Sequence, residues 1–168
     1  GKFAMMPMLE PGNQQEAYDM IHHGFDLSEK YGIPVLLRIT TRLAHSRSGV
    51  VRKVARPQNE LKLPDTPNQF ILLPANARKR YKVLLANQPD FLQEANGSPF
   101  NELLEGKDHT LGIVACGLAY NYLMENYPDR NIQYPVLKVG QYPLPKTQIK
   151  ELYETCDELL VLEDGYLI

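Results

Sequence analysis

Hydrophobic residues in this chain gather in short runs that alternate with amphipathic stretches, most regularly between Leu111 and Glu163. The runs 111–115, 135–140 and 158–163 are apolar at nearly every position, as is typical of strands covered on both faces of a parallel sheet. Between them, 118–124 and 145–156 have helical spacing, the second presenting one apolar face made of Ile149, Leu152, Tyr153 and Cys156. This alternation predicts an α/β fold with parallel strands joined by crossover helices.

The first fifty residues contain one more helix and strand of the same kind. Asn13 stands three residues before Glu16, a spacing that predicts a capped helix start. An apolar stripe then runs to a stop at Tyr31-Gly32, made of Ala17, Met20, Ile21, Gly24 and Phe25. The run 33–40 is the matching strand, with its proline confined to the beginning, where no ladder donor is needed.

The middle of the chain is less regular. Residues 51–69 are rich in turn-forming types and predict a connection between domains or a hairpin arm, and 70–73 predict a short buried run. A helix after Pro74 places Ala77, Tyr81, Leu84 and Leu85 on one side and Arg78, Lys79, Arg80 and Lys82 mostly on the other. The basic side predicts a solvated face, with an anionic ligand or partner as the alternative. A shorter helix from Pro89 ends at Asn96-Gly97.

Composition narrows the possible classes of protein. A net charge of -2, with 23% charged residues, gives no field that attracts nucleic acid. The sequence has neither an apolar run of membrane-spanning length nor a signal peptide, so no membrane partner and a cytoplasmic location are expected. The chain starts at Gly1 without an initiator Met and stops directly after a strand, so both ends are expected to be cut from something longer.

Metal-binding patterns are missing from the sequence. Cys116 and Cys156 each lie in an apolar element and predict buried free thiols. His22 and His23 are adjacent on a helix and point about 100 degrees apart, so they cannot grip one metal together. They are interpreted as helix surface and flank, and no metal site is expected in this chain.

One loop and one turn carry the candidate chemistry. Cations and hydroxyls crowd the end of the strand at 33–40 and the loop beyond it: Arg38, Thr40, Thr41, Arg42, His45, Ser46, Arg47 and Ser48. Such a set suits a carboxylate or a phosphate, although a solvated basic loop is the alternative. Cys116-Gly117 sits at a strand-to-helix turn but matches neither G-x-G-x-x-G nor a Walker A loop. Gly117 is therefore interpreted as a structural residue that lets the helix turn back closely on the sheet.

Five segments occur together in one known family. They read MLEPGNQQEAYDM (8–20), PVLLRITTRLAHSRS (34–48), LPANAR (73–78), LGIVACGLAY (111–120) and VLEDGY (161–166). In combination they resemble the thiamine-diphosphate-dependent 2-oxoacid:ferredoxin oxidoreductases, and within these the alpha subunits of the indolepyruvate enzymes. The likeness covers most of the chain and is looser over 51–69.

The resemblance implies a division into domains. Residues 1–50 would be the C-terminal end of a pyrimidine-binding domain, contributing its last helix and strand, and 51–73 would be a connecting segment. Residues 74–168 would form a three-layer αβα sandwich similar to the transketolase C-terminal domain. The chain would thus be an internal fragment of one subunit.

The resemblance also implies an activity for the complete enzyme. Members decarboxylate an aryl 2-oxo acid on thiamine diphosphate and Mg²⁺, pass two electrons through 4Fe-4S clusters to ferredoxin, and form an acyl-CoA. Implied partners are the rest of the subunit, a second subunit, ferredoxin, the 2-oxo acid and CoA. This sequence lacks a Gly-Asp-Gly motif followed by Asn and a C-x-x-C-x-x-C run, and the activating glutamate would lie before Gly1. The piece alone is expected to bind none of these cofactors and to be inactive.

Site residues follow from the same resemblance. Thr40, Thr41 and Arg42 would orient the substrate carboxylate, and His45 would donate a hydrogen bond or a proton as the catalytic residue. Glu10 and Asn13 would line the same cleft, or serve only as turn and helix cap.

Two alternative functions of the chain stay open. One is another thiamine-diphosphate enzyme, of transketolase or 2-oxoacid dehydrogenase type. The other is a non-catalytic docking domain whose helix at 78–82 binds an acidic partner.

Overall fold

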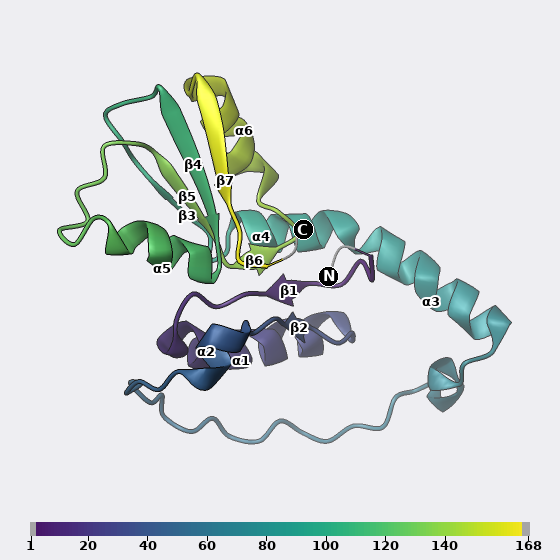
Figure 1. Cartoon of the computed structure of the whole chain (residues 1–168). Coiled ribbons are helices and arrows are strands. Elements are labelled where there is room, and N and C mark those ends of the chain that lie inside the picture. Colours follow the sequence, from purple (N-terminus) through teal and green to yellow (C-terminus); the bar gives the residue numbers. More distant parts are fainter. Residues whose placement is uncertain (1–2, 166–168) are drawn as a thin grey trace.

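The computed structural model describes residues 3–165 (Figure 1). The expected cut ends at Gly1 and Ile168 lie outside the described residues. In chain order the elements are β1 (Met8–Leu9), α1 (Gln14–Tyr31), β2 (Leu36–Leu37), α2 (Thr41–His45), the 3-10 helix η1 (Pro67–Phe70), α3 (Pro74–Ala86), α4 (Gln88–Asn96), β3 (Glu102–Leu104), β4 (Leu111–Cys116), α5 (Leu118–Glu125), β5 (Val136–Val139), β6 (Gln141–Tyr142), α6 (Lys146–Thr155) and β7 (Glu158–Leu162).

The larger sheet has the order β3-β5-β4-β7. Strands β5, β4 and β7 are parallel, as the apolar runs predicted, and Ile113 of β4 pairs with both Val136 and Leu160. The sequence did not predict β3, which pairs antiparallel with β5 and makes the sheet mixed. Helices α5 and α6 pack on opposite faces, because residues 113 and 115 of β4 contact α5 while 114 and 116 face α6. The αβα layering implied by the resemblance is therefore confirmed.

A smaller sheet, β2-β1-β6, connects the two halves of the chain. Strands β1 and β2 are parallel, and β6 joins β1 antiparallel with Tyr142 opposite Met8. Since only Gly140 separates β5 from β6, the segment 136–142 passes from one sheet directly into the other. The first fifty residues are thus attached at the carboxyl ends of the larger sheet's parallel strands (Figure 1).

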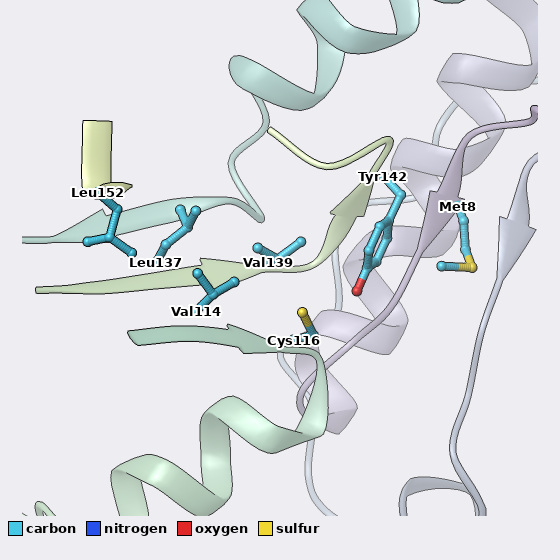
Figure 2. Close-up of a cluster of buried hydrophobic side chains, with 7 residues drawn as sticks. All are labelled: Met8, Val114, Cys116, Leu137, Val139, Tyr142 and Leu152. Atoms are coloured by element: carbon cyan, nitrogen blue, oxygen red, sulfur yellow. The ribbon is translucent and has the colours of Figure 1, made fainter. Parts of the chain in front are cut away.

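Buried side chains form one cluster on each face of the larger sheet. On the α6 face, Leu152 packs against strands β4 and β5, and the cluster continues through Tyr142 to Met8 of β1 (Figure 2). On the α5 face, Tyr120 packs with Ile113 and Val136. The first cluster is therefore shared between the two sheets, which couples their packing.

Several sequence predictions about burial are wrong. The run 70–73 is exposed rather than buried, with Leu72 90% exposed. Tyr153 is 71% exposed, so only three of the four expected face residues of α6 pack on the sheet. Strand β7 exposes Leu160 and Val161, although its apolar run predicted cover on both faces. Leu159 and Leu162 of β7 pack against the two core clusters. The exposed side chains of β7 and of 70–73 have no covering element among residues 3–165.

Residues 46–66 form an extended arm without regular structure, not a hairpin (Figure 1). The arm runs along α1, where Val51 N–H donates to Gln15 Oε1 at 2.7 Å and Lys53 Nζ pairs with Asp19 at 2.8 Å. Helix α3, which follows the arm and η1, projects away from the two sheets and has no buried residue (Figure 1). Whether 51–73 divides two domains stays a prediction.

Candidate functional site

The candidate loop after β2 folds into the one-turn helix α2 rather than a loop. Thr40 is its N-cap in extended backbone (φ -74°, ψ 156°), but its side chain makes no capping hydrogen bond. Leu43 is buried and anchors the turn. Thr41 and His45 are four residues apart and share one face of the turn.

The polar side chains of this turn are available for a ligand. Thr41, Arg42 and His45 are exposed, and Thr40 Oγ1 is buried without a hydrogen-bond partner. Among residues 3–165 none of these four side chains forms a hydrogen bond or ion pair. The structure thus brings together four of the six residues predicted to form the site. Their hydrogen-bond donors have no acceptor among residues 3–165.

Neighbouring elements hold α2 from two sides. Gln14 Nε2 at the start of α1 donates to Ser46 Oγ at 2.6 Å, and Ser46 Oγ donates to the Leu43 carbonyl at 2.7 Å. On the other side, the Arg42 guanidinium lies over the Tyr122 ring of α5, 5.0 Å from its centroid. The turn is therefore fixed against both halves of the chain.

Glu10, the fifth predicted residue, directly follows β1 and is fully buried at 0% exposure. Its carboxylate forms an ion pair with Arg38, which follows β2, and accepts a hydrogen bond from Tyr142 Oη at 3.0 Å. Arg38 Nη2 also donates to the Asp164 carbonyl after β7, at 2.6 Å. Glu10 therefore lies in a buried polar cluster where β1, β2, β6 and β7 end, and its place in the substrate cleft stays a prediction.

Burial sets the protonation of this cluster. Desolvation raises the pKa of Glu10 above 4.5, against the opposing effects of the Arg38 charge and the Tyr142 hydrogen bond. Burial also raises the pKa of the neighbouring Cys116 thiol to about 11 and that of Tyr142 above its usual range. In Figure 2 the Tyr142 hydroxyl points toward Cys116. Burial thus disfavours the charged forms of Glu10, Cys116 and Tyr142, and Cys116 has the character of an inert core thiol.

Asn13, the sixth predicted residue, caps α1, because its Oδ1 accepts from Glu16 N–H at 2.9 Å. Glu16 Oε2 accepts from Gly12 N–H at 2.9 Å, one residue earlier than in a standard capping box. The same Glu16 forms an ion pair with Lys138 of β5. The cap is thus part of the contact between the two halves.

Gly117 begins α5 with φ 49° and ψ -124°, and a Cβ there would lie 2.5 Å from Glu10 Cγ. The close packing predicted at Gly117 is present, but the close neighbour is Glu10, directly after β1, rather than the sheet beneath α5.

Residues 3–165 contain no group of three or more His, Cys, Asp or Glu side chains placed to hold a metal ion. Cys116 is buried, Cys156 is half-buried, and both are free thiols as predicted, although the burial expected of Cys156 is only partial. No helix of the described part is long and apolar enough to cross a membrane.

The sequence did not point to several residues that build the site. Tyr142 and Tyr122 lie in other elements, so nothing in the local sequence connects them with Glu10 or Arg42. His23 was interpreted as helix flank, but its Nε2 lies 2.7 Å from Oε1 of the buried Gln141. Arg38 carried one usable signal, a cation directly after an apolar strand, where a buried partner is the usual reason for its position.

Comparisons with known proteins identify relatives over nearly the whole chain. It is 36% identical over 166 residues to an indolepyruvate oxidoreductase subunit IorA of Methanothermobacter thermautotrophicus. Its identity to the IorA of Archaeoglobus fulgidus is 39% over 168 residues, and to that of Pyrococcus abyssi 35% over 173. No protein-family model matches.

A solved structure of similar fold is a 2-oxoglutarate:ferredoxin oxidoreductase from Magnetococcus marinus with 2-oxoglutarate, coenzyme A and succinyl-CoA bound. The TM-score is 0.62 at 18% identity, over 96% of this chain and 35% of that one. The resemblance to the 2-oxoacid:ferredoxin oxidoreductases is thus confirmed in sequence and in fold. The match to the first IorA relative covers 97% of this chain. The chain therefore spans only 27% of the length of that relative.

Proposed function

We propose that this chain is the part of an indolepyruvate:ferredoxin oxidoreductase subunit that presents the α2 turn to the carboxylate of an aryl 2-oxo acid. The complete enzyme would oxidatively decarboxylate that acid to an acyl-CoA and transfer the electrons to ferredoxin. The relatives are named indolepyruvate oxidoreductase subunits, and the solved structure of similar fold is a 2-oxoglutarate:ferredoxin oxidoreductase with coenzyme A bound; both support this proposal.

One structural observation supports it more than any other. The side chains of Thr40, Thr41, Arg42 and His45 gather on one anchored turn, and none forms a hydrogen bond or ion pair among residues 3–165. A buried hydroxyl without a partner costs about 1–3 kcal/mol, so ligand binding near Thr40 would offset an existing penalty. An anion that accepts hydrogen bonds from the turn fits this arrangement.

The roles follow from the chemistry of the donors. Arg42 offers a planar fork that matches both oxygens of a carboxylate. Thr41 and Thr40 supply hydroxyl donors, and His45, four residues after Thr41, can donate a hydrogen bond or proton to the 2-oxo group. Glu10 and Asn13 support the turn through Arg38 and the cap of α1 rather than by substrate contact.

Thiamine diphosphate, Mg²⁺ and 4Fe-4S clusters would belong to other parts of the complete enzyme. The residues of this chain do not fit them, because it has no Gly-Asp-Gly motif and its two cysteines lie in different elements. We therefore assign no reaction step to a cofactor held by this chain. The chain alone would be inactive.

Further partners would be the rest of the same subunit, a second subunit, ferredoxin and CoA. The relatives are named as subunits, which supports assembly with another polypeptide. We place the complete enzyme in the cytoplasm, where two free thiols remain reduced.

We expect Arg42→Ala in the complete enzyme to raise the KM for the 2-oxo acid about 10- to 100-fold, because a charge-assisted hydrogen bond contributes about 1.5–3 kcal/mol. Steady-state reduction of ferredoxin against 2-oxo acid concentration measures the change. Arg52→Ala on the exposed arm removes the same charge and should leave KM unchanged.

An unchanged KM in Arg42→Ala would remove this arginine from the substrate site.

The identity of the electron acceptor distinguishes the proposed enzyme from a transketolase or a 2-oxoacid dehydrogenase component. Substrate-dependent reduction of NAD through a lipoyl group, with none of ferredoxin, would contradict the proposal.

Helix α3 supports a second candidate function, docking to an acidic partner protein. Arg78, Lys79 and Lys82 are exposed, and residues 70–86 contain no acidic side chain. The same stretch exposes the apolar run 70–73 and Tyr81. Apolar side chains bordered by unpaired cations suit a protein surface with carboxylates around an apolar centre.

We expect the triple change Arg78→Glu, Lys79→Glu and Lys82→Glu to weaken association with such a partner at least about tenfold, since like charges then face each other. Titration calorimetry with the purified partner subunit, at two salt concentrations, measures the affinity. Lys146→Glu with Lys150→Glu on α6 is the matched control. Unaltered affinity in the triple variant would exclude α3 as the docking surface.

A further inference from the structure

We propose that Tyr122 of α5 is a positioning residue that holds the Arg42 guanidinium in the orientation required to bind the substrate carboxylate. This inference rests on the proposed function and adds a residue to its site. Tyr122 would act through Arg42 and would not touch the substrate. Neither the loop at 40–48 nor any motif of the chain points to Tyr122.

The geometry that carries the inference is the contact between α2 and α5. The Arg42 guanidinium carbon lies 5.0 Å from the centroid of the Tyr122 ring, within the range of a cation–π interaction. Tyr122 is half-buried, whereas Arg42 is exposed. Among residues 3–165 no carboxylate pairs with Arg42, so the ring is the partner that the structure provides for its charge.

The position of Tyr122 is itself fixed by its neighbour. Asn121 Nδ2 donates to the Gly12 carbonyl at 2.5 Å, which ties the first half of α5 to the segment before α1. Tyr120, on the other side, is buried in the α5-face cluster. The ring that supports Arg42 is therefore carried by a stretch of helix that packs against both halves of the chain.

An aromatic ring close to the guanidinium suits the proposed task because of how guanidinium binds. The interaction with an aromatic ring uses the face of the guanidinium, whereas hydrogen bonds to a carboxylate use N–H groups in its plane. An exposed Arg side chain without a support samples many rotamers and loses that freedom when a ligand binds. The contact with Tyr122 restricts Arg42 before the substrate arrives, and the N–H donors of Arg42 form no hydrogen bond among residues 3–165.

The consequence is that substrate affinity depends on both halves of the chain. Arg42 comes from the first fifty residues, and Tyr122 comes from the helix that follows β4. A change in how these halves pack would alter the orientation of the fork without altering any residue that binds the carboxylate.

The test uses the complete enzyme, with ferredoxin reduction measured against 2-oxo acid concentration. We expect Tyr122→Ala to raise the KM about two- to fivefold, the range of one cation–π contact, and to leave kcat within about twofold. Tyr122→Phe keeps a ring under the guanidinium and should retain the original KM. Tyr153→Ala removes an exposed tyrosine on α6 and should change neither constant, and thermal melting of each variant reports any loss of folding.

A double-mutant cycle separates this inference from the proposed function. If Tyr122 acts through Arg42, Tyr122→Ala has no further effect on KM in the Arg42→Ala background. Additive effects, an unchanged KM in Tyr122→Ala, or a raised KM in Tyr122→Phe would overturn the inference while Arg42→Ala still supports the proposed function. An unchanged KM in Arg42→Ala would overturn both.

Discussion

The Gly117→Ala variant is expected to lose about 3–5 kcal/mol of unfolding free energy, from a backbone that L-residues rarely adopt and from overpacking. Gly117 has φ 49° and ψ -124°, and an added Cβ would lie 2.5 Å from Glu10 Cγ and 2.8 Å from its carboxyl carbon. Glu10 cannot move away easily, because it is fully buried and bound to Arg38 and Tyr142. Urea denaturation followed by circular dichroism measures the loss.

Gly32→Ala is the matched control for this prediction. Gly32 also has positive φ, 59°, as the C-cap of α1, but a Cβ there would meet nothing within 4 Å. Its substitution should therefore cost only the left-handed backbone penalty, about 1 kcal/mol. If both variants lost the same free energy, steric conflict with Glu10 would make no contribution, and the close contact between β1 and α5 would not matter for stability.

The contrast between these two glycines shows how far the sequence predicts the fold. Gly32 was predictable, because it follows the last residue of an amphipathic helix, where a left-handed glycine is common. Gly117 was predictable as a turn between β4 and α5, but the residue that forbids a side chain lies more than a hundred positions earlier. The local sequence pattern predicts the turn at Gly117. The steric conflict with Glu10 depends on the tertiary fold, which brings two distant segments into contact.

The same limit explains which strands were found. Strands β4, β5 and β7 are apolar at nearly every position, so the sequence predicts them and their parallel pairing. Strands β3 and β6 have three and two residues, too few for a period to show. Their pairing is decided by neighbours, since β6 exists only because β1 lies beside Tyr142. The junction between the sheets was therefore not predicted.

The residues of the candidate site also differ in whether local sequence predicts them. Arg42, Thr41 and His45 were proposed because unusual residue types follow an apolar strand, and the cap at Asn13 was correctly predicted from its spacing to Glu16. The sequence could not place Glu10 in a closed cluster with Tyr142 or place Tyr122 under Arg42, because those contacts span 132 and 80 positions respectively. Chemistry on one segment can be predicted from sequence, whereas its support from distant segments cannot.

Glu10→Ala should destabilise the chain by about 3 kcal/mol, the lower end for breaking a buried ion pair, because Arg38 keeps 27% of its side chain exposed. The substitution leaves a cavity and removes the acceptor of the Tyr142 hydroxyl, which is itself buried. Denaturation at neutral pH measures the loss. A cost under about 1 kcal/mol would show that the cluster does not hold the two sheets together.

Glu10→Gln tests the charge separately from the shape. Burial raises the folded-state pKa of Glu10 above 4.5, so the folded chain binds its proton more tightly than the unfolded chain. Glu10 therefore contributes most to stability below pH 4.5, and that contribution is lost as pH rises through the raised folded pKa. Glutamine cannot ionise, so the stability of Glu10→Gln relative to the unsubstituted chain should increase as pH rises from about 4 to 8. A relative stability that decreases over this interval would mean that the Arg38 charge outweighs desolvation, and that Glu10 is held as a carboxylate.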